Sequence, residues 1–291
     1  MSSERAKVRP ANRPDEQAFV FECEGAMLPA VLHRPVVSAE RGVLVIVGGP
    51  QYRIGSHRQF VHLSRGLAAA GYPVLRFDYR GMGDAEGELA GFERVDTEIR
   101  LAIDVFVRKV PTLREVVLWG LCDAASAAID YAWQDPRVRG LVLLNPWVRT
   151  EAGEARAYLR HYYFGRLVDR GFWQRLLSGR VNPLRAAGSL LDLLHRARTR
   201  NQVVDDRSLD LPVRMVRDLK RFQGQVLLVL SGQDLTADEF RDVVAGSPQW
   251  QQTLNRHSTT RLDLPEANHT FSRREWRDRV SAGTVDWLRA W

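Results

Sequence analysis

The most informative segment of the chain is VVLWGLCDAASAA, which runs from Val116 to Ala128. Its first residues are apolar and β-branched, as in a buried strand, and its last residues are small, as in a tightly packed helix. The turn between them reads Gly-x-Cys-x-Ala, which is the nucleophile-elbow pattern Gly-x-Ser-x-Gly with Cys122 at the nucleophile position. Gly120 and Ala124 are small, as such a turn requires, because the strand and helix backbones pass close together there.

Cys122 has two interpretations. At the start of a helix, backbone N–H groups and the helix dipole favour the thiolate, which is the nucleophilic form of cysteine. The alternative is a buried thiol in an ordinary strand–turn–helix. Ser126 lies one helical turn further on, where we expect it to pack inside rather than to react.

Composition limits the class of protein. The chain has 291 residues, of which 45% are hydrophobic and 26% charged, as in a globular protein with a core. No segment reaches the roughly 18–20 apolar residues of a membrane span. Residues 1–15 carry no apolar signal region, and we expect a flexible tail there. Cys23 and Cys122 fall in different expected elements, which argues against a disulfide and favours a reducing, cytoplasmic compartment.

The net charge of +7 comes from one segment. Residues 149–200 hold 11 arginines, no lysine and 4 acidic residues, whereas the rest of the chain holds 31 basic and 31 acidic residues. No zinc-finger spacing, RNA-recognition signature or phosphate-binding loop accompanies these arginines, which argues against nucleic acid as a partner. Their interleaved aromatic residues are typical of packing within a small helical unit.

Strand-like and helix-like segments alternate along the rest of the chain. Expected strands cover 17–24, 28–33, 43–47, 73–77, 116–121, 138–144, 225–230 and 259–264, and helices follow most of them. This alternation predicts a doubly wound, mostly parallel α/β sheet with an N-terminal β-hairpin. Residues 151–221 show no strand pattern. The predicted domains are the tail, an α/β core over 16–148 and 222–291, and a helical cap over 149–221.

Two helix starts in the second half of the core carry capping signals. Thr236 is the expected N-cap of a helix that runs to residue 245. Ser272 and Glu275 have the spacing of a capping box for the terminal helix.

Polar residues follow the strands at the edge of the sheet where doubly wound proteins bind ligands. Asp234 comes after the strand that ends near residue 230, and His269 comes after the last strand. With Cys122 they give the chain order nucleophile, acid, histidine that accompanies a nucleophile elbow. Asp238 competes with Asp234 as the acid but falls inside the expected helix, and the alternative for His269 is a cap on the terminal helix.

These features together resemble the α/β-hydrolase superfamily over nearly the whole chain, from about residue 19 to residue 291. The segment DYRGMGD (Asp78–Asp84) is similar to the Asp-x-Arg-Gly-x-Gly turn common in that superfamily. Two further segments, GPQYRIGSHRQF (Gly49–Phe60) and GLCDAAS (Gly120–Ser126), resemble the exosortase-A-associated hydrolases, which are bacterial enzymes encoded with exopolysaccharide and exosortase loci. That resemblance implies a context rather than a substrate.

The residue types then predict acyl-transfer chemistry. His269 would deprotonate Cys122 or pair with it as imidazolium and thiolate, and Asp234 would orient the imidazole. The oxyanion would take the N–H of Asp123 and a second N–H from the turn after the strand 43–47. Proline at position 50 has no N–H, and likeness to the His-Gly-Gly-Pro turn of proline-iminopeptidase-like hydrolases implies Gly49 as the donor, with Gln51 as the alternative.

Three residues near this turn are candidates for substrate binding. Arg53 either binds an acidic group of the substrate or pairs with Asp84 or Glu86. His57 and Arg58 are placed to reach the mouth of the pocket.

The leading hypothesis is a hydrolase that cleaves an ester or thioester of a small-molecule or carrier-linked acyl substrate through an acyl-Cys intermediate. The alternatives are an acyltransferase to a sugar or amine and a non-catalytic binding protein on the same fold. The arginine-rich cap would hold an anionic part of the substrate or touch an anionic membrane surface. No cofactor and no metal are expected.

Overall fold

The computed structural model describes residues 15–49, 51–148, 210–256 and 258–291. The predicted tail, except for Asp15, which begins the first strand, and most of the predicted cap lie outside these residues. Described residues up to Trp147 and from Met215 onward form one compact unit, which contains the sheet. No helix in the described part of the chain is long and apolar enough to cross a membrane.

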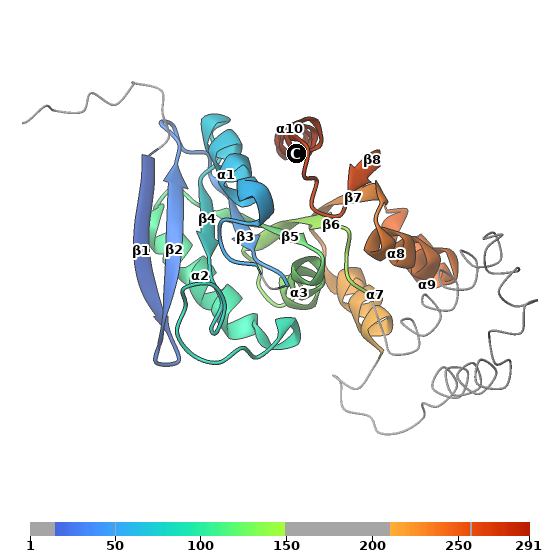
Figure 1. The fold of residues 1–291 in the computed structure, drawn as a ribbon, viewed down its shortest axis with the longest axis horizontal. Coiled ribbons are helices and arrows are strands. Elements are labelled where there is room, and N and C mark those ends of the chain that lie inside the picture. The colour runs from blue at the N-terminus through green and yellow to red at the C-terminus, as the bar shows by residue number, and fades with distance from the viewer. Residues whose placement is uncertain (1–14, 50, 149–209, 257) are drawn as a thin grey trace, which may run out of the picture. The chain divides into compact units, whose positions relative to one another are not determined.

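The sheet has eight strands in the order β1-β2-β4-β3-β5-β6-β7-β8 (Figure 1). The first two pair antiparallel through the turn at Glu24 and Gly25, and β2 pairs antiparallel with β4; all remaining neighbours are parallel. The predicted mostly parallel sheet with an N-terminal hairpin is therefore confirmed. The strands are β1 (Asp15–Cys23), β2 (Ala26–Arg34), β3 (Arg41–Ile46), β4 (Val74–Phe77), β5 (Glu115–Leu121), β6 (Val138–Leu144), β7 (Gln225–Gln233) and β8 (Thr259–Asn268).

Helices cover both faces of the central strands. From Val116 to Leu121 every residue of β5 is buried, which explains its continuous apolar run. In Figure 1, α1 and α10 lie on one face of the sheet and α2 and α3 on the other. The described helices are α1 (Gln59–Ala69), α2 (Asp96–Lys109), α3 (Asp123–Ala132), α7 (Leu211–Arg221), α8 (Leu235–Ala245), α9 (Pro248–Leu254) and α10 (Arg274–Arg289), with short 3-10 turns at Ser56–Arg58 and Phe92–Arg94.

Both expected helix caps differ from the structure. Asp234, not Thr236, is the N-cap of α8, and its carboxylate accepts the N–H groups of Thr236 and Ala237. The terminal helix begins at Arg274, after an N-cap residue with no side-chain cap, because Ser272 turns back to Asn268 instead. The first difference matters for the site, since it fixes the Asp234 carboxylate in place.

Candidate active site

The turn at Cys122 joins β5 to α3 with the backbone in a conformation that L-residues rarely adopt. Its φ is 65° and its ψ is −125°. A Cβ atom on Gly120 would lie 2.6 Å from the carbonyl carbon and oxygen of Ala124, so only glycine fits there. The Cys122 N–H donates to the Leu144 carbonyl (2.9 Å), and its own carbonyl accepts the Trp147 N–H (3.2 Å). These bonds to the end of β6 and beyond hold the side chain at the edge of the sheet.

Asp234 lies at the same edge, between β7 and α8. As the N-cap it accepts the N–H groups of Thr236 and Ala237, both at 3.2 Å. Only 6% of its side chain is exposed. The start of the helix therefore holds a buried carboxylate in one orientation.

His269 follows β8 and interacts with both of the preceding residues. Its Nδ1 lies 2.8 Å from Asp234 Oδ2, and its ring is near enough to the Cys122 side chain to interact with it electrostatically. The hydrogen bond to Asp234, and then the interaction with Cys122, raise the pKa of His269 to about 10 against the opposing effect of burial. Both neighbours therefore favour the charged form of the imidazole.

Asn145, which sequence reasoning did not assign to the site, connects two of these turns. It is fully buried at the end of β6 with a positive φ of 43°. Its amide group donates to Ser231 Oγ (2.8 Å) and to the His269 carbonyl (3.2 Å), and its oxygen accepts the Ser231 N–H (2.9 Å). The signal was present in the sequence, because Asn145 is a polar residue directly after a buried apolar strand.

The turn after β3 brings Gly49 to the start of α3. The Gly49 N–H donates to Asp123 Oδ2 at 2.8 Å, and the Ala124 N–H donates to Asp123 Oδ1 at 2.9 Å. Burial raises the pKa of Asp123 above its usual range, although these two N–H groups act in the opposite direction. The predicted donor residue is thus beside the elbow, with its N–H bound to the Asp123 carboxylate. Gln51 lies nearby, and its side-chain oxygen accepts the Ser56 N–H (3.3 Å).

Arg53 is paired within the protein. Its guanidinium forms ion pairs with the buried Asp78 and, at 2.8 Å, with Asp84. Its backbone N–H also donates to Asp78 Oδ1 at 2.6 Å. Both carboxylates belong to the DYRGMGD turn, so Arg53 holds that turn against the turn after β3. His57 and Arg58 are exposed and both have positive φ values.

The side chains of Ser126 and Cys23 take other partners or none of those described for Cys122, His269 and Asp234. The Ser126 hydroxyl is fully buried and donates to the Trp147 carbonyl at 2.6 Å. Cys23 is buried in β1, where burial raises the pKa of its thiol. Both cysteines are free.

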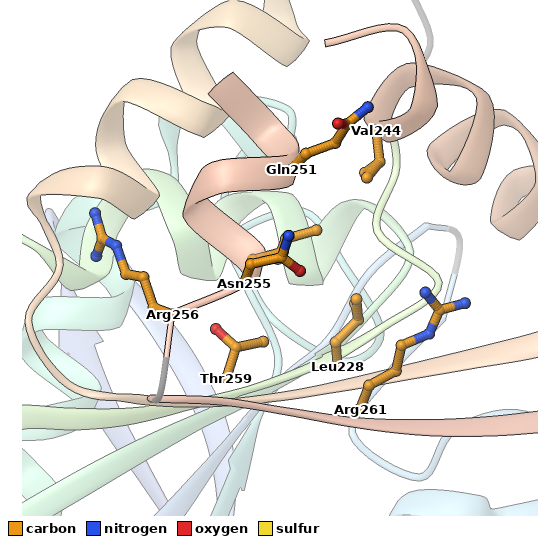
Figure 2. A pocket seen from close by; sticks show the side chains of 8 residues that line it. Leu228, Val244, Gln251, Asn255, Arg256, Thr259 and Arg261 are labelled. Carbon is orange, nitrogen blue, oxygen red and sulfur yellow. The ribbon is translucent and has the colours of Figure 1, made fainter. Parts of the chain in front are cut away.

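A separate cavity of about 410 Å³ lies between the sheet and the helices of the second half (Figure 2). Its lining differs entirely from the residues at the elbow, so it is not the space in which a group bound to Cys122 would lie. Side chains from β7, α8, α9, the turn after α9 and the start of β8 line it: Leu228, Val244, Gln251, Leu254, Asn255, Arg256, Thr259 and Arg261.

Comparison with known proteins finds one family and many similar folds. The family model described as serine aminopeptidase, S33, matches residues 38–239, which is more than half of the chain. No curated protein sequence matches. An esterase from Pyrococcus furiosus has 12% sequence identity and a TM-score of 0.65, with 96% of this chain and 93% of that chain covered.

Two other solved structures are similar in the same way. A thermostable carboxyl esterase from Bacillus coagulans, solved with glycerol, has 18% identity and a TM-score of 0.63, with 94% of this chain and 98% of that chain covered. A dienelactone hydrolase from Anabaena variabilis has 15% identity and a TM-score of 0.61, with 96% and 99% covered. At such identities these likenesses concern the fold.

Proposed function

We infer the function from the fact that the chain belongs to the hydrolase family described as serine aminopeptidase, S33, within the α/β-hydrolase superfamily. We propose that it hydrolyses an ester or thioester through an acyl intermediate on Cys122. The observation that carries this proposal is the hydrogen bond of His269 to Asp234, on an imidazole that also interacts electrostatically with Cys122. A protonated imidazole close to a cysteine sulfur favours the thiolate.

The first half of the reaction forms the acyl intermediate. The Cys122 thiolate attacks the substrate carbonyl carbon, a C–S bond forms, and the carbonyl π electrons move onto oxygen. When the carbonyl reforms, the bond to the leaving group breaks and that group takes the proton from His269. Asp234 keeps the Nδ1–H in place and stabilises the charge of the ring until the proton has left.

The second half regenerates the enzyme. A water molecule loses a proton to His269 and attacks the acyl carbon, and the C–S bond then breaks to give the acid product and the thiolate. In an acyltransferase a sugar hydroxyl or an amine would take the place of this water. Sulfur suits activated acyl donors better than amides, which favours an ester or thioester over the peptide that the family description names.

The biological setting is also part of the proposal. The segments Gly49–Phe60 and Gly120–Ser126 resemble the exosortase-A-associated hydrolases, which favours an acyl substrate from an exopolysaccharide system. The arginine-rich residues 149–200 supply positive charge for an anionic carrier. We expect the enzyme to act in the cytoplasm and to need no cofactor.

The test uses the two cysteines of the chain as a matched pair. Cys122→Ala should lose turnover of p-nitrophenyl esters and acyl-CoA thioesters by at least about 1,000-fold, whereas Cys23→Ala should retain it. Mass spectrometry of quenched wild-type reactions should find the acyl mass on the peptide that contains Cys122. Turnover by Cys122→Ala at the wild-type rate would refute the proposal.

A non-catalytic binding protein is the second candidate, and one observation favours it. The Gly49 N–H that would stabilise an oxyanion is bound to the Asp123 carboxylate. Alkylation with iodoacetamide at pH 6–7 separates the two candidates. A Cys122 that reacts much faster than a free thiol supports the hydrolase, and an inert Cys122 supports the binding protein.

A further inference from the structure

The Asp123 carboxylate lies where an acyl-transfer reaction develops its own negative charge. An oxyanion hole at a nucleophile elbow uses the N–H of the residue after the nucleophile and an N–H from the turn after the neighbouring strand. Here that second N–H, on Gly49, donates to Asp123 Oδ2 at 2.8 Å. The Asp123 carboxylate thus accepts the N–H group that the substrate oxygen would need.

The surrounding backbone is shaped to accept this carboxylate. A Cβ atom on Gly48 would lie 2.1 Å from Asp123 Oδ1, so the absence of a side chain there leaves room for the carboxylate. The Ala124 N–H donates to the same oxygen at 2.9 Å. Two backbone donors and a glycine therefore hold Asp123 as an anion bound inside the hole.

We propose that Asp123 is the specificity-determining residue of this site. While it is negatively charged, its carboxylate blocks the oxyanion hole by accepting the Gly49 N–H. The preferred substrates carry a positive charge near the scissile carbonyl, which attracts the carboxylate away from Gly49. The inference rests on the proposed function, because it concerns the same acyl-transfer site.

The charges of the described residues support a cationic rather than an anionic acyl group. Asp123 and Asp234 both contribute negative charge beside Cys122, and the cation that stabilises ionised Asp123 is His269, which already pairs with Asp234. The arginine of the neighbouring turn, Arg53, is paired with two carboxylates of its own. A carboxylate that leaves Gly49 therefore gains most from positive charge on the substrate.

The kinetic test compares two substrates of the same shape. The p-nitrophenyl ester of 4-(trimethylammonio)butyrate carries a positive charge, and the ester of 5,5-dimethylhexanoate is its neutral analogue. Asp123→Ala keeps the main-chain N–H of residue 123 and empties the hole, and Asp123→Asn keeps the shape without the charge.

We expect Asp123→Ala to hydrolyse the neutral ester about 10- to 100-fold faster than wild type, the factor that corresponds to one charge-assisted hydrogen bond. Asp123→Asn should hydrolyse the neutral ester at a rate between those of wild type and Asp123→Ala. The ratio of cationic to neutral rates should fall by at least about 10-fold in both variants. The control is Asp96→Ala. Asp96 is the first residue of α2, as Asp123 is the first residue of α3, and its replacement should leave both rates unchanged.

A second readout does not depend on turnover. In the Cys122→Ala protein, the NMR shift of the Gly49 amide proton should follow the titration of a carboxyl group, and Asp123→Asn should abolish that titration. If Cys122 proves not to be a nucleophile, this result still establishes Asp123 as the occupant of the hole. A Gly49 amide that does not titrate, a neutral-ester rate that Asp123→Ala does not raise, or an unchanged cationic-to-neutral rate ratio would overturn the inference.

Discussion

Replacing Asp234 with asparagine tests how the start of α8 controls the histidine. The carboxylate receives three N–H groups: Thr236 on Oδ1 at 3.2 Å, and Ala237 (3.2 Å) and His269 (2.8 Å) on Oδ2. Asparagine has only one accepting oxygen. If that oxygen takes the Oδ2 position, one N–H group loses its acceptor; if it takes the Oδ1 position, two do.

We therefore expect the asparagine oxygen to keep facing His269. The imidazole then retains its Nδ1–H and its orientation, and it loses only the negative charge of its partner. A charge-assisted hydrogen bond is about twice as strong as a neutral one, so kcat/KM should fall about 10- to 100-fold. A reversed asparagine would impose the wrong tautomer, which costs about 10,000-fold in a serine protease.

The stability of the variant gives an independent check. The Thr236 N–H left without an acceptor should lower the free energy of unfolding by about 1–3 kcal/mol. Ser247→Ala is the matched control, because it removes the N-cap of α9, which accepts the Trp250 N–H, at a cost of about 1 kcal/mol. It should leave kcat/KM unchanged. Ester hydrolysis and urea denaturation measure both quantities, and a 10,000-fold loss of kcat/KM in Asp234→Asn would refute the reasoning.

Three further results are expected. Gly120→Ala should destabilise the protein by more than about 3 kcal/mol in urea denaturation, because its Cβ would lie 2.6 Å from backbone, whereas Gly246→Ala, with its nearest contact at 3.3 Å, should change stability by less than about 0.5 kcal/mol. Arg53→Ala should cost about 3–5 kcal/mol by leaving the buried Asp78 unpaired, while iodoacetamide still alkylates the elbow cysteine at the wild-type rate. Since the pKa of His269 is raised from 6.5 to about 10, its stabilising contribution is complete below pH 6.5 and should be lost as pH rises to about 10, a loss that His269→Gln should lack in the same denaturation series.

The fold and the grouping of Asp234 and His269 at the edge of the sheet where Cys122 lies could be predicted because their signals are local. Apolar runs mark the strands, small residues on both sides of Cys122 mark the close approach of β5 and α3, and the carboxyl ends of parallel strands meet at one edge. A polar residue after such a strand therefore lies near that edge wherever it falls in the chain. Asp234 and His269 were found by this rule, and Asn145 obeys it too.

The contacts between loops could not be predicted, because they depend on which of several nearby groups pairs best. The sequence offered Asp84 and Glu86 as partners of Arg53, and the structure pairs it with Asp84 and with Asp78, which is buried. Spacing alone likewise did not show that the Asp123 side chain reaches Gly49, since this requires a particular side-chain rotamer and an absent side chain at Gly48.

The backbone at Cys122 sets a limit on how stable this protein can be while it keeps a reactive side chain at that position. With φ at 65° and ψ at −125°, a residue with a Cβ atom is strained there by about 1–3 kcal/mol. Glycine adopts this conformation without that strain. We therefore expect Cys122→Gly to unfold at a higher urea concentration than wild type and to be inert. Selection for stability alone would therefore replace this cysteine with glycine. Keeping the thiol requires a second selection, for reactivity.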